Sequence, residues 1–211
     1  MYIAIEGVIG VGKTTLARLL QTSFDADLLL EIFEENPFLS DFYSDRERFA
    51  FQTQIFFLLS RYHQQRKGVP EALKNNPWLI SDYTFEKDRL FAEANLFGDE
   101  LETYFQVHEA LAEKIIKPDL ILYLQADTDV LMQRIAHRDR PYERQMDIHY
   151  IDTLNRNYNA RFKHYPGQIV LTINTNELDY VRYHDHLEQI EQRIRQTLKL
   201  SPFQESLPID L

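Results

Sequence analysis

Cysteine is absent from the 211 residues, so the chain forms no disulfide and no thiolate metal site, which is typical of proteins of the reducing cytoplasm. Basic residues are few: 23 lysines and arginines stand against 33 acidic residues, a formal charge of -10. Because that charge repels a phosphate backbone, nucleic acid is not expected as a partner. A long apolar run and a signal peptide are also missing, so we expect a soluble cytoplasmic protein without a membrane partner.

The hydrophobic content of 44% suits one compact domain with a real core in a chain of this length. We expect that domain to cover residues 1–200. The last stretch, 201–211, contains Pro202 and Pro208 and has no hydrophobic periodicity, which predicts a tail.

Short apolar runs alternate with longer segments of helical period, a pattern typical of helices packed on a mostly parallel sheet. We therefore predict an α/β fold, in which helices flank a five-stranded parallel sheet. The predicted strands are Tyr2–Glu6, Leu28–Ile32, Trp78–Asp82, Leu120–Leu124 and Ile169–Ile173. The predicted helices are Lys13–Phe24, Arg46–Lys67, Phe85–Leu96, Glu100–Ile116, Thr128–His137, Arg144–His164 and Glu177–Leu198.

A complete phosphate-binding loop follows the first predicted strand directly, and it holds three of the six glycines. Glycines let the backbone turn its amide hydrogens inward, a helix begins at Lys13 with its positive dipole end at the same point, and the lysine ammonium reaches the terminal phosphates during catalysis. The loop predicts a P-loop kinase fold that uses ATP and Mg²⁺. Its donor-binding residues are Gly7, Val8, Ile9, Gly10, Val11, Gly12, Lys13, Thr14 and Thr15.

Asp82 ends the apolar run of the third predicted strand. In a P-loop fold that strand end lies beside the loop, so the Asp82 carboxylate can hold Mg²⁺ while Thr14 offers its hydroxyl. The other interpretation is that Asp82 caps the helix that follows, and both can hold together.

Gln54 and Arg61 lie two turns apart on one face of the strongly apolar helix that begins at Arg46. Polar groups in an apolar stripe need partners, and a planar heterocycle with hydrogen-bonding edges would supply them. The alternative, that both side chains are exposed on the solvent side, is equally compatible with the sequence.

A carboxylate at the end of the second predicted strand would point into the cleft at the carboxyl edge of the sheet. A hydroxyl acceptor has a high pKa, so its attack on the terminal phosphate benefits from a base that accepts the proton. Glu31 is the candidate for that base.

Three arginines follow the fourth predicted strand, and they predict a lid at about 134–145. Arginines on a lid can neutralise the charge that builds up on the transferring phosphoryl group. The alternative is a solvated basic helix end that the helix dipole favours. The catalytic candidates of this segment are Arg134, Arg138 and Arg140.

Together these segments resemble the deoxynucleoside kinases, in particular the bacterial deoxyguanosine and deoxyadenosine kinase branch, over nearly the whole chain up to about Leu198. The markers are Ile5 to Thr15, Glu31 to Leu39 with Phe42-Tyr43, Phe51 to Gln54 through Arg61, Asp82-Tyr83-Thr84 with Asp88, and Arg134 to Arg140. The resemblance implies transfer of the γ-phosphate of ATP to the 5′-hydroxyl of a deoxynucleoside, with a purine preferred, in nucleotide salvage. It also implies a homodimer.

Residue by residue, the resemblance implies that Glu31 is the general base and that Tyr43 and Glu143 bind the 3′-hydroxyl of the sugar. It implies that Gln54, Arg61 and Asp88 read the base edge and that Asp82 helps to hold Mg²⁺. Many family members have an arginine where this chain has Tyr83, and that arginine orients the general base. We expect another cation, such as a lid arginine, to take over its work. The preferred base stays open between guanine, adenine and cytosine.

Two other functions fit parts of the sequence. A thymidylate-kinase-like enzyme shares the loop, fold and lid, but its acceptor is a phosphate, which needs cations and no carboxylate base, so Glu31 counts against it. A non-enzymatic nucleotide-dependent switch is disfavoured because the chain has no Asn-Lys-x-Asp motif.

Overall fold

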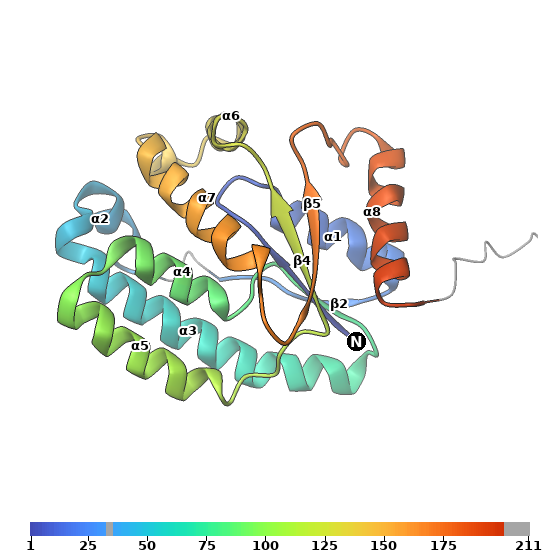
Figure 1. Ribbon diagram of the computed structural model, residues 1–211, viewed down its shortest axis with the longest axis horizontal. Helices are drawn as coiled ribbons and strands as arrows, with labels where there is room; N and C mark the ends of the chain where they lie inside the picture. Colours follow the sequence, from blue (N-terminus) through green and yellow to red (C-terminus); the bar gives the residue numbers. More distant parts are fainter. Residues whose placement is uncertain (33–35, 201–211) are drawn as a thin grey trace, which may run out of the picture.

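The computed structural model describes residues 1–32 and 36–200, so Phe33–Glu35 and the predicted tail 201–211 lie outside the described residues. Within this part, the strands form one sheet in which every neighbouring pair is parallel, in the order β2-β3-β1-β4-β5 (Figure 1). The α/β prediction with a five-stranded parallel sheet is thus confirmed. The strands are β1 Tyr2–Glu6, β2 Asp27–Leu29, β3 Leu79–Ser81, β4 Leu120–Gln125 and β5 Ile169–Asn174.

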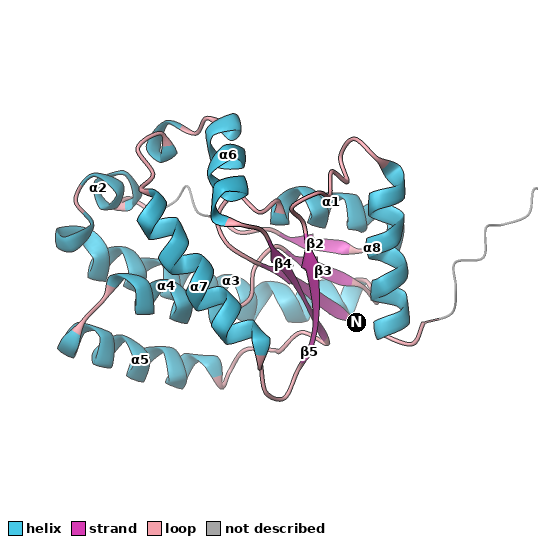
Figure 2. Ribbon diagram, turned by 45° about the horizontal axis from the view of Figure 1, so that its top comes forward, coloured by secondary structure: helices cyan, strands magenta, loops and turns pink. Residues whose placement is uncertain are grey.

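Helices cover both faces of the sheet. Figures 1 and 2 show α1 and α8 on one side, and α3, α4, α5 and α7 on the other. This layering buries both faces of the parallel strands, which explains why they read as continuous apolar runs. The helices are α1 Lys13–Phe24, α2 Leu39–Ser44, α3 Arg46–Asn75, α4 Glu86–Asn95, α5 Gly98–Ala112, α6 Thr128–Arg138, α7 Ile148–Lys163 and α8 His184–Thr197, with a 3-10 turn at Pro141–Glu143.

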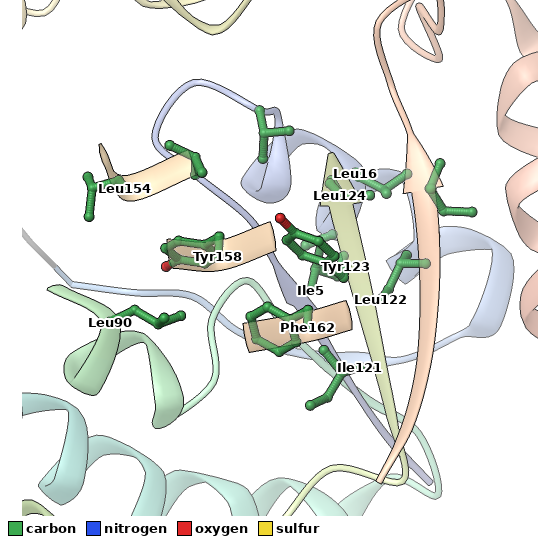
Figure 3. Close-up of a cluster of buried hydrophobic side chains, with 14 of the residues drawn as sticks. Ile5, Leu16, Leu90, Ile121, Leu122, Tyr123, Leu124, Leu154, Tyr158 and Phe162 are labelled. Carbon is green, nitrogen blue, oxygen red and sulfur yellow. The ribbon is translucent and has the colours of Figure 1, made fainter. Parts of the chain in front are cut away.

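The core lies around the interior strand β4, which pairs with β1 and β5 and whose residues Leu120 to Leu124 are at most 1% exposed. Successive side chains point to opposite faces (Figure 3): Leu122 and Leu124 lie toward Leu16 of α1, and Tyr123 lies toward α7. There Tyr123 stacks on Phe162 with ring centroids 4.8 Å apart. Each such buried side chain contributes about 1.5–3 kcal/mol, so the central strands are held rigidly and can carry a site at their ends.

Helix α3 is longer than predicted, because it continues beyond Lys67 through Pro70 to Asn75. Pro70 removes one backbone donor, which is why the sequence indicated an end here. Tertiary packing offsets that loss: Val69 is fully buried in a cluster with Tyr2 and Leu79. At Gly68 a Cβ would lie 2.9 Å from the Leu29 side chain, so glycine lets the helix approach β2.

Other boundaries differ from the prediction where a cap or a short element decides them. Helix α7 begins at Ile148 rather than Arg144, because the Asp147 side chain accepts a hydrogen bond from the backbone of His149. Helix α2 was not predicted, and α8 begins at His184 rather than Glu177. Strand β2 ends at Leu29, so Glu31 lies in the loop beyond it. Over residues 1–32 and 36–200, none of the helices has the length and apolarity that crossing a bilayer requires.

Candidate active site

A cavity of about 330 Å³ opens at the carboxyl edge of the sheet, where the segments after β1, β2 and β3 meet. Parallel strands bring such segments to one edge, which is the usual place for ligands in α/β proteins. Most of the predicted site residues line this cavity: Ile9, Gly10, Lys13, Thr14, Glu31, Tyr43, Gln54, Arg61, Asp82, Arg138, Arg140 and Glu143.

The phosphate loop has the backbone that its glycines predict. Gly10 and Gly12 adopt φ values of 86° and 102°, a region that other residues rarely enter. Gly12 is the N-cap of α1 and has no side chain to occupy the free amides of the first helical turn, which therefore face the cavity as an anion site. Lys13 Nζ donates to the carbonyl oxygens of Gly7 and Val8, at 2.7 and 3.1 Å.

Two buried side chains hold the loop against its surroundings. Glu6 accepts hydrogen bonds from the backbone N–H of Gly7 at 3.1 Å and from that of Thr84 at 2.6 Å. It thereby ties the end of β1 to the segment after β3, and burial raises its pKa. On the other side, Tyr180 Oη donates to the carbonyl of Gly12 at 3.2 Å. The loop is preorganised by these contacts, so a bound phosphate need not order it.

Asp82 lies between the phosphate loop and Glu31, as the sequence predicted. Its Oδ2 accepts a hydrogen bond from Thr14 Oγ1 at 2.5 Å, and its Oδ1 accepts one from the backbone N–H of Glu31 at 2.8 Å. A hydroxyl and a carboxylate beside a phosphate loop are the hard oxygen ligands that Mg²⁺ takes. Among the described residues, no group of three or more His, Cys, Asp or Glu side chains is placed to hold a metal ion.

Glu31 is clamped by two cations from different helices. Its Oε1 accepts hydrogen bonds from Arg61 Nε and Nη2, at 2.9 and 2.6 Å, and its Oε2 accepts one from Lys87 Nζ at 2.5 Å. Burial would raise the pKa of Glu31, but the charges of Lys87 and Arg61 outweigh it and hold that pKa well below its usual range. The side chain is therefore an ionised carboxylate. A carboxylate has about four acceptor sites, so one stays available on Oε2.

Gln54 and Arg61 are 1% and 4% exposed, and both line the cavity, which excludes the interpretation that they face solvent. Gln54 Oε1 has no hydrogen-bond partner among the described residues. The Arg61 guanidinium lies 4.5 Å from the centre of the Phe57 ring and pairs with the buried Asp88. Asp88 is not among the described residues that line the cavity, so its predicted contact with the base stays a prediction.

Tyr43 and Glu143 meet across the cavity mouth from α2 and the 3-10 turn. The Tyr43 ring stacks on that of Tyr142 with centroids 5.8 Å apart, and burial raises the pKa of Tyr43 well above its usual value. Glu143 is buried and accepts two hydrogen bonds from Arg138 Nη2, at 2.6 and 2.7 Å. Arg140 lies 3.7 Å from the same carboxylate. Two of the three predicted lid arginines, Arg138 and Arg140, thus line the same cavity as the two predicted sugar ligands.

Arg134 occupies a different place from the other two lid arginines. Its guanidinium donates to the carbonyl oxygen and hydroxyl of Thr175, at 2.5 and 3.0 Å, and to the carbonyl oxygen of Val11 at 3.4 Å. It is not among the described residues that line the cavity. In this structure Arg134 links the phosphate loop to the end of β5, and its contact with a phosphoryl group stays a prediction.

Tyr83 stands where the resemblance implies an arginine, and among the described residues no hydrogen bond joins it to Glu31. Its buried hydroxyl donates to Gln64 Oε1 at 2.5 Å, and Gln64 Nε2 donates to the carbonyl oxygen of Leu30 at 2.7 Å. This chain of hydrogen bonds supports the backbone just before Glu31. We expected another cation, such as a lid arginine, to take over the work of the family arginine. Arg138 pairs with Glu143, and the cation on Glu31 Oε2 is Lys87, which was not predicted.

Lys87 was not among the predicted site residues. It is 7% exposed, and it lies in the first turn of α4, one residue before Asp88. A signal was present in the sequence, because the positive end of a helix dipole disfavours a cation in the first turn. A lysine kept there therefore indicates a specific anionic partner, but the sequence does not identify it as Glu31, 56 positions earlier.

Comparisons with known proteins agree with the phosphate loop and the cavity described above. A family model described as "Deoxynucleoside kinase" matches residues 3–199. The "Deoxyguanosine kinase" of Bacillus subtilis (strain 168) is 34% identical over 201 residues, which cover 93% of this chain and 97% of that relative. The "Deoxyadenosine/deoxycytidine kinase" of the same organism is 28% identical over 199 residues, covering 91% of this chain and 90% of the relative.

Solved structures also match nearly the whole chain. The structure of deoxyadenosine kinase from M. mycoides with bound dCTP superposes with a TM-score of 0.80 at 27% identity. The superposition covers 93% of this chain and 100% of that chain.

Proposed function

The chain belongs to the deoxynucleoside kinase family and is a kinase, and on that premise we propose that it transfers the γ-phosphate of ATP to the 5′-hydroxyl of a purine deoxynucleoside, deoxyguanosine or deoxyadenosine. The product is a deoxynucleoside monophosphate, which makes this a salvage reaction. The homodimer that the resemblance implies stays a prediction.

The observation that carries this proposal is the pairing of an ionised carboxylate with a phosphate loop in one cavity. Glu31 and Lys13 line the same cavity, and the buried Gln54 and Arg61 lie on its wall beside Phe57. An acceptor that is already a phosphate would meet repulsion from Glu31. A deoxynucleoside instead presents a neutral hydroxyl, whose proton the Glu31 carboxylate can accept. Its heterocycle would lie in the slot, against the Phe57 ring and within reach of the polar groups of Gln54 and Arg61.

In the proposed reaction the 5′ O–H bond breaks and its proton passes to the Glu31 carboxylate. The oxygen forms a bond to the γ-phosphorus, and the bond from that phosphorus to the β,γ-bridging oxygen breaks, its electron pair leaving with ADP. The amides of the phosphate loop and the Lys13 ammonium bind the phosphates through these steps. The proton then leaves Glu31 for solvent.

Thr14 and Asp82 are the residues that would hold Mg²⁺. The chemistry that the ion supplies in such a site is neutralisation of charge on the β- and γ-phosphates. The 2.5 Å contact between Thr14 Oγ1 and Asp82 Oδ2 supports this assignment, because it places two hard oxygen ligands side by side at the loop.

Asp82→Asn is expected to raise the Mg²⁺ concentration for half-maximal activity by roughly 10- to 100-fold. The amide oxygen can still accept the hydrogen bond of the Glu31 N–H, so the loss is mainly one of charge. The measurement is a Mg²⁺ titration of the initial rate at saturating ATP and nucleoside. The exposed Asp99→Asn serves as the control, and an unchanged half-point in Asp82→Asn would remove Asp82 from the ion site.

The function is tested by a panel of the natural deoxynucleosides and their monophosphates with ATP as donor. Phosphorylation of nucleosides, with a purine nucleoside preferred, is the expected result. Exclusive use of monophosphates would establish the thymidylate-kinase-like alternative instead. Thermal protection by nucleoside triphosphates without turnover of any acceptor would favour the regulatory switch.

Gln54→Leu tests whether the slot reads the base edge. Removing a buried hydrogen bond to the base is expected to raise the KM for the nucleoside by roughly 10- to 100-fold and to blur the choice among bases, with kcat changed by less than about threefold. Leucine has a similar shape, so folding should be kept. Gln52→Leu is the matched control, because it lies two residues away on the same helix and is exposed. An unchanged KM and base preference in Gln54→Leu would show that Gln54 does not contact the base.

A further inference from the structure

The Lys87 side chain is held in an environment that disfavours a free cation. It is 7% exposed and sits at the positive end of the α4 dipole. Removing such an ammonium from water costs several kcal/mol unless it is paired. Its ion-pair partner is Glu31, at 2.5 Å between Nζ and Oε2. The bond joins α4 to the loop after β2, two elements that meet at the cavity.

Lys87 also lies near the phosphate end of this cavity. It lines the wall together with Lys13 and Glu31. Burial lowers the pKa of Lys13 to about 8, and the charge of Lys87 is the next largest cause. The two ammonium groups are thus close enough to repel each other. A purely structural ion pair would not need to face a phosphate loop, whereas a cation serving the reaction would.

The other polar groups considered for Glu31 each have a further partner elsewhere. Arg61 binds Oε1 and is also paired with Asp88. Its position on the wall of the proposed base slot is therefore fixed by Asp88 as well as by Glu31. Arg138 binds Glu143, and the Tyr83 hydroxyl binds Gln64. The contact on Oε2, the oxygen that keeps an acceptor site for a hydroxyl, comes from Lys87.

We propose that Lys87 is the positioning residue for Glu31: it holds Oε2 in place and so orients the carboxylate toward the acceptor hydroxyl. This inference rests on the proposed function, in which Glu31 accepts the 5′-hydroxyl proton. Lys87 itself transfers no proton. It takes over the charge of the arginine that Tyr83 replaces, while Tyr83 and Gln64 support the backbone at Leu30.

The test compares Lys87→Met and Lys87→Arg in kcat and in the KM for the nucleoside. For Lys87→Met we expect kcat to fall by roughly 10- to 100-fold and the KM for the nucleoside to change by less than about threefold, because the carboxylate loses its orientation while the nucleoside keeps its contacts. Lys87→Arg should restore most of kcat. Lys114→Met, at an exposed site, is the matched control.

A double-mutant cycle with Glu31→Gln gives a second readout. Because Lys87 acts through Glu31, Lys87→Met should lower kcat little further in the Glu31→Gln background. The double variant also leaves no carboxylate unpaired, so it stays informative if Lys87→Met alone does not fold. Additive losses, or a kcat of folded Lys87→Met within about threefold of the parent, would overturn the inference. Near-normal turnover of Glu31→Gln would instead overturn the proposed role of Glu31. The two results distinguish a wrong role for Lys87 from a wrong role for Glu31.

Discussion

Lys13→Ala is expected to abolish phosphoryl transfer, with kcat/KM lowered by roughly a thousandfold or more. The backbone amides of the phosphate loop donate hydrogen bonds to phosphate, and the Lys13 ammonium supplies the full positive charge of the loop. In the structure its Nζ binds the carbonyls of Gly7 and Val8 and lies at the cavity wall. Alanine keeps the helical backbone of α1 but leaves the terminal phosphates without a cation from the loop.

The same variant should remain folded. Burial and the charge of Lys87 lower the pKa of Lys13 to about 8, so the folded protein holds this cation at a cost. Losing it removes two hydrogen bonds but also the repulsion from Lys87. We therefore expect a thermal midpoint within about 4 °C of the parent protein. Lys67→Ala, at an exposed position of α3, is the control for kinetics and unfolding; activity of Lys13→Ala within tenfold of the parent would contradict the role.

The parts of the site that the sequence predicted are those set by local structure. A phosphate loop is one continuous segment between a strand and a helix, so its glycines and Lys13 specify it without help from the rest of the chain. Strand ends are nearly as local, and Asp82 lies where an apolar run stops. Helical spacing placed Gln54 and Arg61 on one face, and the burial of both excludes the alternative that this face is exposed to solvent.

The parts that the sequence did not predict depend on contacts between distant segments. Lys87 is part of the site only because α4 packs beside the loop after β2, and no local pattern contains that pairing. Asp88 pairs with Arg61 for the same reason. The helix through Pro70 survives because Val69 is buried against Tyr2 and Leu79, a tertiary gain that local propensity does not include.

Glu31→Gln is expected to lower kcat by roughly two to four orders of magnitude while nucleoside binding is largely kept. Glutamine fills the same space and its oxygen can still accept from Arg61, but it cannot take the proton of the 5′-hydroxyl. Nucleoside affinity is measured by calorimetry and kcat by steady-state assay, with the exposed Glu102→Gln as the control. Turnover close to that of the parent would show that Glu31 only orients the substrate.

The Glu31→Gln result also distinguishes a deoxynucleoside kinase from a nucleoside monophosphate kinase. A hydroxyl acceptor must lose its proton as it attacks, so the rate depends on the carboxylate. A monophosphate acceptor is already ionised, and for it the Glu31 charge is a repulsion, so glutamine should leave its phosphorylation unchanged or faster. Opposite effects on nucleosides and monophosphates in one variant would therefore identify the acceptor from the chemistry of the step itself, independently of which substrate binds more tightly.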